Sequence, residues 1–480
     1  MNNTKYIISK LKKDTNNSDE IIYRKKQINN NTIYIIYNEP LVSSNTISDY
    51  IIRSLNHLSR KNIPINKIIA NNIDNIKIKS IYTYQDITYY LNNGFTIILI
   101  EESNTYFALE TKRNLSRGIN TPQTENTLRG AMDSFVEDIQ TNMGLIKKRI
   151  KSTNLWYKSN EIGKYTKTKV NILYINNIAN KKLVNYLNKT IKKINIDGIL
   201  SIGTIKNLIE KENKSVFPTI ISTERPDKTC EALLQGRIVI LADNSQFALI
   251  LPITLNDLFI STEDNFGKSI NITLTRIIRY ISFFITILTP AIYLALITYN
   301  QYILPERLLI NFTIQRTNVP FPAFIEALIM MTSFEILREC DLRSPNFSNS
   351  AMSTVGALIL GSAAAEAKIV SPIMIIIIAI TSLSSLLFTE PEIINGIRWY
   401  RLLFMLSASI MGITGIFLFF IYFITKLCSL NSFTTPYLVP FSPLSITGIK
   451  NSIIKLPTKK LNKRLRFFTK NITRYKEENK

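Results

Sequence analysis

The chain has 480 residues, of which 46% are hydrophobic, and 58 Lys and Arg against 35 Asp and Glu give it a formal net charge of +23. This length exceeds that of one compact domain and predicts two to four domains. The sequence has one histidine, no Walker-type phosphate loop and no GxGxxG motif, so we expect neither enzymatic activity nor a cofactor or metal site. Three widely spaced cysteines predict no disulfide framework.

Residues 1–30 are polar and basic and contain no apolar run like that of a secretory signal. We expect them to form a solvated leader, and we expect the N-terminal half to stay in the cytoplasm. Farther on, residues 33–37 form a short β-type run, and residues 95–100 and 106–111 flank a polar turn as the strands of a hairpin do. These signals predict an α/β subdomain over residues 31–127.

A strand, a helix and a second hairpin then return in the same order. Aligning Tyr37 with Tyr174 and Phe107 with Phe247 gives offsets of 137 and 140 residues. Such nearly constant offsets predict two related α/β subdomains, the second over residues 168–270. The alternative is chance, because short apolar strands resemble one another easily.

Residues 128–167, between the two subdomains, contain the clearest helix signal of the soluble half. Ser134 and Glu137 fit a capping box, and the acidic pair Glu137 and Asp138 suits the positive end of a helix dipole. Apolar residues recur on one face at Phe135, Ile139, Met143, Ile146 and Ile150. This pattern predicts a docked connector helix rather than a catalytic element. We expect assembly contacts at Arg129, Gly130, Phe135, Glu137 and Asp138.

Three apolar runs without a charged residue lie in the C-terminal half, at residues 280–299, 369–389 and 402–425. Each is long enough for a helix to cross about 30 Å of hydrocarbon. Residues 350–365 are a fourth, weaker candidate, whose small residues favour close helix packing. We therefore expect an α-helical, polytopic membrane domain of about four spans over residues 275–428, with both ends of the chain on one side.

Residues 429–480 begin as a proline-rich loop and end as a basic tail. From residue 455 to residue 480 there are ten basic and two acidic residues, a net charge of +8. Because the tail closely follows an apolar run, this charge favours a cytoplasmic position and attraction to anionic lipid rather than nucleic-acid binding.

Glu326 lies in an apolar segment, residues 320–338, that also carries two prolines. A carboxylate inside a membrane region costs a few kcal/mol, so it normally faces protein or water. The sequence leaves open whether this segment is interfacial, re-entrant or spanning.

Several motifs resemble, in order, those of the A subunits of GerA-type spore germination receptors. In the soluble half these are Arg129-Gly130, Phe-Val-Glu-Asp at 135–138, Thr-Glu-Arg-Pro-Asp-Lys at 223–228 and Leu-Leu-Gln-Gly-Arg at 233–237. In the membrane half they are residues 320–329, 334–339, 355–359 and 436–441. The match runs from about residue 30 to about residue 455. Ala131 and Ser134 depart from it, because the family usually has proline and glycine there.

The resemblance implies a subunit of a nutrient-sensing complex in the inner membrane of dormant spores. It also implies two partners, a transporter-like B subunit and a lipoprotein C subunit. The A subunits would assemble into a homo-oligomeric ring whose membrane helices form a cation channel, opened when the B subunits bind nutrient. The N-terminal domain and the tail would face the cytoplasm or spore core.

Within this interpretation, residues 350–365 are a candidate pore wall. The candidate pore or gate residues are Ser353, Val355, Leu358, Ile359 and Ser362, which alternate polar and apolar side chains. Glu326 and Glu366 are candidates for attracting cations. A packed helix and a hydrogen-bonded structural carboxylate are the alternatives. The alternative function is a non-conducting scaffold that relays the state of the transporter-like partner; a secondary transporter is favoured less, because no inverted repeat is evident.

Overall fold

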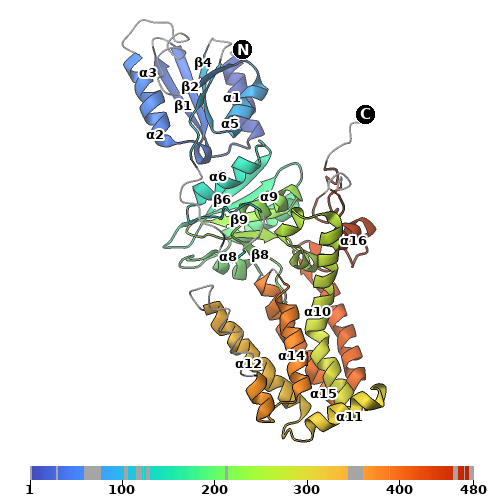
Figure 1. The fold of residues 1–480 in the computed structure, drawn as a ribbon. Helices are drawn as coiled ribbons and strands as arrows, with labels where there is room; N and C mark the ends of the chain where they lie inside the picture. The colour runs from blue at the N-terminus through green and yellow to red at the C-terminus, as the bar shows by residue number, and fades with distance from the viewer. Residues whose placement is uncertain are drawn as a thin grey trace.

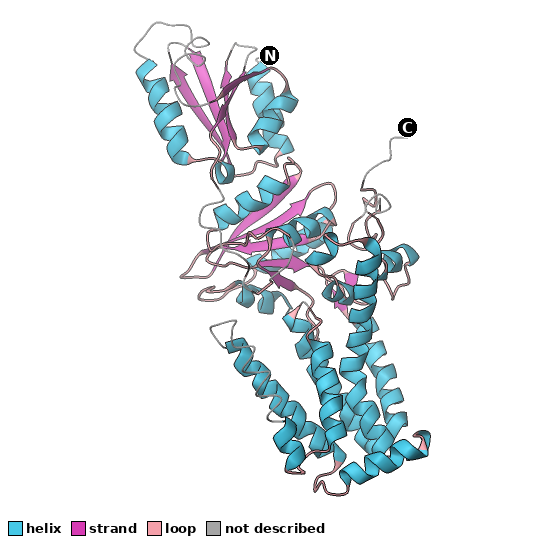
Figure 2. Cartoon of the chain, in the orientation of Figure 1, coloured by secondary structure: helices cyan, strands magenta, loops and turns pink. Residues whose placement is uncertain are grey.

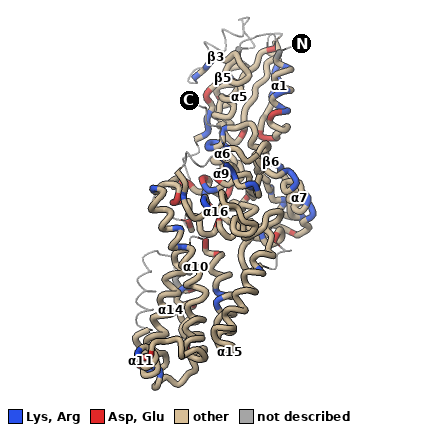
Figure 3. The backbone as a smooth tube through the Cα atoms, turned by 90° about the vertical axis from the view of Figure 1, so that its right-hand side faces the viewer, with Lys and Arg blue, Asp and Glu red and all other residues tan. Residues whose placement is uncertain are grey.

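Two α/β modules stand one above the other, over a group of long helices (Figure 1). The computed structural model describes residues 3–28, 31–58, 77–101, 106–114, 122, 124–125, 130–210, 215–343, 361–388, 390–457, 463–469 and 471–474. Lysine, arginine and acidic residues are concentrated in the modules and become sparse along the helices below (Figure 3).

The first module is a five-stranded antiparallel sheet in the order β1-β2-β4-β5-β3, with helices on both faces (Figure 2). Its strands are β1 (Ile21–Ile28), β2 (Asn31–Asn38), β3 (Ile78–Ile81), β4 (Phe95–Ile100) and β5 (Tyr106–Glu110). One face is covered by α1 (Asn3–Asp14) and α5 (Tyr84–Asn92). The other is covered by η2 (Ile47–Ile52) and α3 (Arg53–Leu58), which follow η1 (Glu39–Leu41) and α2 (Ser44–Thr46) in the chain.

The expectation of a solvated leader over residues 1–30 is wrong, because α1 and β1 lie there. Ile7 and Leu11 of α1 are buried against the sheet. Ile21 and Ile28, at the two ends of strand β1, are buried in the cores on its two faces. The segment is polar in composition because α1 is amphipathic and β1 is an edge strand whose middle residues are exposed. Elements that bury only one side carry many charges without being unstructured.

The second module repeats the first. Its sheet has the order β6-β7-β9-β10-β8, which is the same order with each strand replaced by its counterpart. The strands are β6 (Leu155–Ile162), β7 (Thr168–Ile175), β8 (Ile221–Thr223), β9 (Ile238–Ala242) and β10 (Ala248–Leu251). Helices α6 (Ile139–Arg149) and α9 (Pro226–Leu234) cover one face, and α7 (Lys181–Lys192) and α8 (Ile202–Ile209) cover the other.

The predicted duplication is therefore confirmed, and its alignment holds in detail. Tyr37 on β2 packs against the α2–α3 side of the first sheet, and Tyr174 on β7 packs against the α7–α8 side of the second. Phe107 and Phe247 lie on the same corresponding sides. The aligned residues thus occupy equivalent places in two copies of one fold.

The predicted connector helix is the first helix of the second module, where α6 takes the place that α1 has in the first. The prediction of a capping box at Ser134 and Glu137 is wrong. The helix α6 begins at Ile139, and the carboxylate of Asp138 accepts hydrogen bonds from the backbone N–H groups of Gln140 and Thr141. The connector region 128–167 is also too long, because it includes the edge strand β6. The predicted apolar face is confirmed by burial of Phe135, Ile139, Met143, Ile146 and Ile150.

Below the second module lie α10 (Ser269–Thr298), α11 (Glu306–Arg316), α12 (Ala323–Arg343), α14 (Pro372–Ser385) and α15 (Pro391–Ser429) (Figure 1). Among the described residues, α10 and α15 are long and apolar enough to cross a membrane, and α14 is a shorter apolar helix. The helix α12 packs on α14 and points back toward the modules. Shorter elements are η4 (Leu255–Phe259), η5 (Thr262–Asn265), η6 (Gln301–Ile303), β11 (Asn431–Ser432), β12 (Thr435–Pro436) and α16 (Ile446–Ile453).

The helix α15 consists of two helical halves that meet at Gly412, where φ is 61° and ψ is −141°. The ring of Phe404 lies 4.7 Å from that of Phe419, and the ring of Tyr400 lies 4.6 Å from that of Phe423. In a straight helix residues 404 and 419 would be about 22 Å apart, so the halves must lie antiparallel. The expectation of one span over residues 402–425 is therefore wrong: the chain turns within it.

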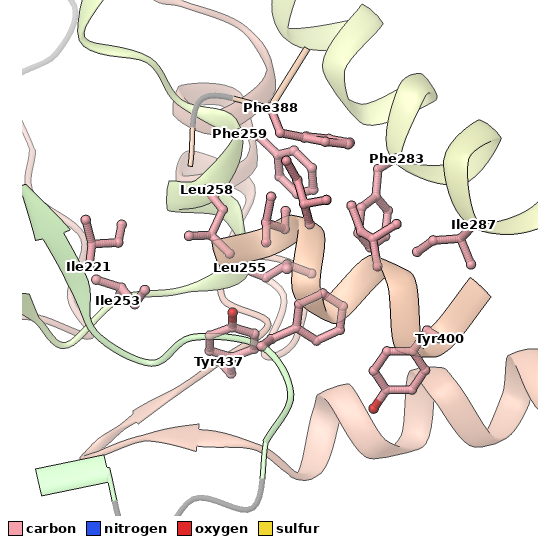
Figure 4. Packing of buried hydrophobic residues seen from close by; sticks show 14 of the residues in the cluster. Ile221, Ile253, Leu255, Leu258, Phe259, Phe283, Ile287, Phe388, Tyr400 and Tyr437 are labelled. Carbon is pink, nitrogen blue, oxygen red and sulfur yellow. The ribbon is translucent and has the colours of Figure 1, made fainter. Parts of the chain in front are cut away.

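A single apolar core runs from the second module into the membrane helices. It joins the α6–α9 face of the second sheet to α10, α14 and α15. Phe259 of η4, Phe283 of α10 and Tyr400 of α15 converge on it (Figure 4). This continuity means that the second module and the helices pack as one body of side chains rather than as two units joined by a linker.

The described part of the basic tail packs on the second module. The guanidinium of Arg464 donates to the carbonyl of Leu234 at 2.7 Å. Phe468 is buried, and its ring lies 4.3 Å from the guanidinium of Arg237. Residues 463–469 are therefore docked on protein, and lipid attraction by the tail stays a prediction.

Candidate coupling site

Lys228 of α9 holds the first residues of α15. Its ammonium group forms an ion pair with Glu390, the residue before α15, and donates a hydrogen bond to Glu125 at 2.9 Å. All three side chains are largely buried. Glu390 has extended backbone and Pro391 occupies the first helical position, which suits a helix start because proline lacks the N–H that would have no partner there.

The charges at this place are strongly coupled. Burial alone would lower the pKa of Lys228, but the fields of Glu390 and Glu125 outweigh burial and raise it above its ordinary value. Burial raises the pKa of Glu390, and Lys228 opposes that rise. One lysine cation is thus shared by two carboxylates in a poorly solvated place. Removing the cation, or removing the carboxylates, would leave an uncompensated buried charge.

A second ion pair lies two residues along α15. Lys206 of α8 pairs with Glu392, which is the more exposed of the two side chains. Because α8 and α9 cover opposite faces of the second sheet, the start of α15 is attached to both faces at once. A cavity of about 430 Å³ borders the pair and is lined in part by Lys206, Glu210, Glu392 and Asn395.

Aromatic packing reinforces the attachment. Phe217 precedes β8 and stacks on Tyr400 of α15, with ring centroids 5.3 Å apart and planes 9° from parallel. A Cβ added at Gly396 would lie 2.5 Å from the Phe217 ring, so glycine is needed for this close approach. The ring of Phe217 also meets Phe283 of α10 and Phe423 of the returning half of α15. Phe217 therefore contacts α10 and both halves of α15 at once.

The start of α10 is fixed in a similar way. Arg276 and Arg279 are buried and form ion pairs with Asp264 at 2.7 and 3.0 Å. Arg279 also donates to the carbonyl of Phe259 at 3.0 Å. Both arginines therefore face inward, where they share one carboxylate and donate to backbone carbonyls.

The predicted connector residues lie in the second module. Phe135 is buried and its N–H donates to the backbone carbonyl of Glu224; the carboxylate of Glu137 is exposed and accepts from the side-chain amide of Gln246. Gly130 has φ +143°, and Asp138 lies 3.8 Å from Arg113 of the preceding module. Arg129 lies outside the described residues. Roles in assembly stay predictions.

The candidate pore residues Ser353, Val355, Leu358 and Ile359 lie outside the described residues. Ser362 and Glu366 belong to a helical stretch at 361–366, and both are exposed.

Glu326 is fully buried in the chain. Its carboxylate accepts hydrogen bonds from the backbone N–H of Ser371, at 2.6 Å, and from the Ser371 hydroxyl, and it lies 3.7 Å from Arg316. It thereby joins α11 and α12 to the first turn of α14, where a carboxylate suits the helix dipole. This geometry fits the alternative of a structural carboxylate, and cation attraction by Glu326 stays a prediction.

Five residues of this site were not predicted from the sequence: Lys206, Phe217, Lys228, Glu390 and Glu392. One signal was available: Glu390-Pro391-Glu392 has the acidic residues and proline expected at a helix start. The partner lysines lie more than a hundred residues earlier, and no local pattern connects them. In the part of the chain that the structure describes, no group of three or more His, Cys, Asp or Glu side chains is placed to hold a metal ion.

The two modules are joined at Lys147 of α6. Its ammonium group pairs with Glu20 and donates to Asn38 at 3.1 Å, both in the first module. We expect Lys147→Met to destabilise this junction by about 3 kcal/mol, because Glu20 would be left buried and unpaired. Amide hydrogen exchange of β1 and α6 in the purified full chain would measure it. Lys148→Met, at the exposed neighbouring position, is the matched control; equal exchange in the two variants would contradict the expectation.

A duplicated α/β region joined by buried ion pairs to membrane helices defines a membrane protein whose soluble and membrane parts are coupled. The family described as Bacillus/Clostridium GerA spore germination protein matches residues 9–467. The chain belongs to the GerA family of spore germination proteins, and the resemblance found in its motifs is confirmed.

Several known proteins are similar to this chain. Spore germination protein KA of Bacillus subtilis is 39% identical over 366 residues, which are 76% of this chain and 67% of that protein. The uncharacterized membrane protein YfkQ of the same organism is 39% identical over 364 residues, 76% of this chain and 71% of that protein. The crystal structure of the N-terminal domain of the A subunit of the Bacillus megaterium spore germinant receptor GerK3 is 32% identical, with a TM-score of 0.40, covering 51% of this chain and 92% of that one.

Proposed function

We propose that this chain is a subunit of a nutrient germinant receptor in the spore inner membrane, and that it triggers germination by forming an oligomeric, ligand-gated cation channel. Membership of the GerA family and the names of its relatives as spore germination proteins support the receptor part. The observation that carries the coupling part is the attachment of α15 to both faces of the second module.

The contacts supply a route from the second module to the membrane helices. A shift of α8 against α9 moves the lysines that pair with Glu390 and Glu392, and therefore changes the position of α15. The helix α15 packs on α10, which packs on α14, and α14 is joined to α12 through Glu326 and Ser371. Packed helices with two arrangements can carry such a shift to a distant gate.

The proposed partners are a transporter-like B subunit, which binds the nutrient, a lipoprotein C subunit, and further copies of this chain. The modules and the tail would face the cytoplasm or spore core. In this arrangement, exposed surfaces of the modules are available to partners while the second module remains joined to α15.

The proposed gate lies at Val355, Leu358 and Ile359, where apolar side chains would close a pore by excluding water. We expect Val355→Ala to widen it, so that spores germinate several-fold more often without nutrient. Spontaneous germination of spores and cation flux into liposomes that hold the chain with its partner subunits would measure this. Ile376→Ala, at an exposed position of α14, is the control for a general effect of shortening an apolar side chain.

The two readouts separate the proposals. If Val355→Ala spores stay dormant and respond normally to nutrient, the gate assignment is refuted, and the receptor proposal is unaffected. Liposomes without nutrient-dependent cation flux, together with a monomeric or dimeric chain, would favour a non-conducting scaffold that relays the state of the partner.

A further inference from the structure

The short helix α16 is fixed beside the first turns of α10 (Figure 1). Arg276 of α10 donates to the carbonyls of Asn451 and Ser452, at 2.9 and 3.1 Å. The N–H of Lys455 donates to the hydroxyl of Thr273 at 3.2 Å. Three hydrogen bonds therefore hold α16 just before the charge-free run of α10 begins.

One side of α16 is packed, and the other carries Ile446, Ile449 and Ile453 beside the exposed polar residues Thr447 and Lys450. Gly448 and Ser452 are buried on the packed side. Within the helix Ile446 is 66% exposed and Ile449 and Ile453 are half-buried, while Leu444 and Ile454, which flank the helix, are 73% and 46% exposed. An amphipathic helix that leaves its apolar side uncovered needs a further surface to cover it.

The outer face of α10 continues this apolar surface. Its exposed apolar residues fall at helical spacing, at Ile270, Leu274, Ile277, Ile278, Ile281 and Phe284, and exposed Asn271 and Thr275 lie between them. The only charged residues in this stretch, Arg276 and Arg279, are buried against Asp264. The outer face is therefore uncharged and mainly apolar both above and within the membrane run, with no charged boundary between the two parts.

Depth and charge identify what covers this surface. Leu274 lies six residues before the start of the apolar run, about 9 Å along the helix, which is close to the thickness of the headgroup layer. The exposed lysines Lys268 and Lys450 stand at the same end. Apolar side chains with cations beside them are the features of a helix that lies among anionic lipid headgroups.

We propose that α16 and the first turns of α10 form an interfacial platform that lies in the headgroup layer on the module side and binds anionic phospholipid. The platform sets the depth of the membrane region and the distance of the second module from the bilayer. It does not depend on whether the chain conducts cations, so a failure of the channel proposal leaves it intact.

Fluorescence quenching at Ile446 tests the proposal. The full chain, with Cys340→Ser and Cys428→Ser to remove the exposed cysteines, carries Ile446→Cys with an environment-sensitive label. It is placed in vesicles of phosphatidylcholine with or without phosphatidylglycerol. We expect lipids that carry a quencher near the headgroup to quench the label several-fold more than at Tyr82→Cys, an exposed position of the first module. Aqueous iodide should show the reverse order.

Two further results complete the test. The label at Ile446→Cys should become better shielded from aqueous iodide when phosphatidylglycerol is present. Lys450→Glu should remove this additional shielding. Quenching by iodide as strong as at Tyr82→Cys would overturn the proposal by showing a solvent-exposed helix. Shielding from both quenchers, with crosslinks between chains at Ile446→Cys, would overturn it in favour of a second copy of this chain.

Discussion

Replacing Lys228 with Met is expected to lower the free energy of unfolding of the chain by about 3–5 kcal/mol, the range found when one partner of a buried ion pair is removed. The variant leaves Glu390 and Glu125 buried beside each other without a cation. Methionine keeps most of the apolar volume of the lysine stem, so the loss reports on charge rather than on a cavity. Thermal or denaturant unfolding of the purified chain in detergent measures the effect, and the amount of protein in spores should fall with it.

Two comparisons isolate the cause. Lys182→Met, on the exposed side of α7, removes a lysine without removing a buried pair and should leave stability unchanged within about 0.5 kcal/mol. Adding Glu390→Gln and Glu125→Gln to Lys228→Met should recover much of the loss, because neutral amides no longer repel each other. Wild-type stability of Lys228→Met alone would show that α15 is not held by this cluster. No recovery in the triple variant would assign the loss to packing.

The duplicated soluble region could be predicted well because its signals are local. Hairpins at 95–111 and 238–251 mark the central strands of each sheet, and apolar strands separated by helices define the rest. Aligning two pairs of aromatic residues was enough to find the repeat. The outer elements α1 and β1 were missed because each buries one side only, so charged residues conceal the apolar positions.

Junctions between distant segments could not be predicted. The unusual position of Glu326 was evident from the sequence, but its partner Ser371 lies 45 residues later. Lys206 and Glu392 are separated by 186 residues, and their pairing depends on how α8 packs against the start of α15. The motif at 223–228 contains Lys228. The role of this lysine becomes evident only in the fold, where Glu390 lies beside it.

The hairpin within α15 was hidden because no charged residue marks its turn. Residues 402–425 carry no charge, and two glycines lie at the turn: Gly412 has the unusual backbone conformation, and a Cβ at Gly415 would collide with the carbonyl oxygen of Ser407. At φ 61° and ψ −141°, Gly412 has a conformation that other residues adopt only with strain. The amide oxygen of Asn300 accepts from the N–H of Ile413 at 3.0 Å and so satisfies a donor that the turn would leave unpaired.

Gly412→Ala is therefore expected to open or unfold the hairpin. The strain of a side chain at this conformation costs about 1–3 kcal/mol. In addition, the new Cβ would lie 2.5 Å from the Asn300 amide oxygen and 2.8 Å from the Cβ of Tyr299. The hydrogen bond to Ile413 would be lost when Asn300 moves. Both halves of α15 would then lose their mutual packing at Phe404 and Phe419, and with it the fixed position of Tyr400 beneath the second module.

Crosslinking measures this directly. Phe404→Cys and Phe419→Cys in a chain lacking Cys340 and Cys428 should react with a short bifunctional reagent when Gly412 is present, and several-fold less with Gly412→Ala. Gly361→Ala is the matched control, since a Cβ there meets its nearest neighbour at an ordinary 3.5 Å. Absence of the crosslink in the Gly412 chain would mean that α15 is straight, and residue 423 would then be about 34 Å from residue 400. In that event Phe217 could not contact both halves, and the second module would be coupled to the membrane through the start of α15 alone.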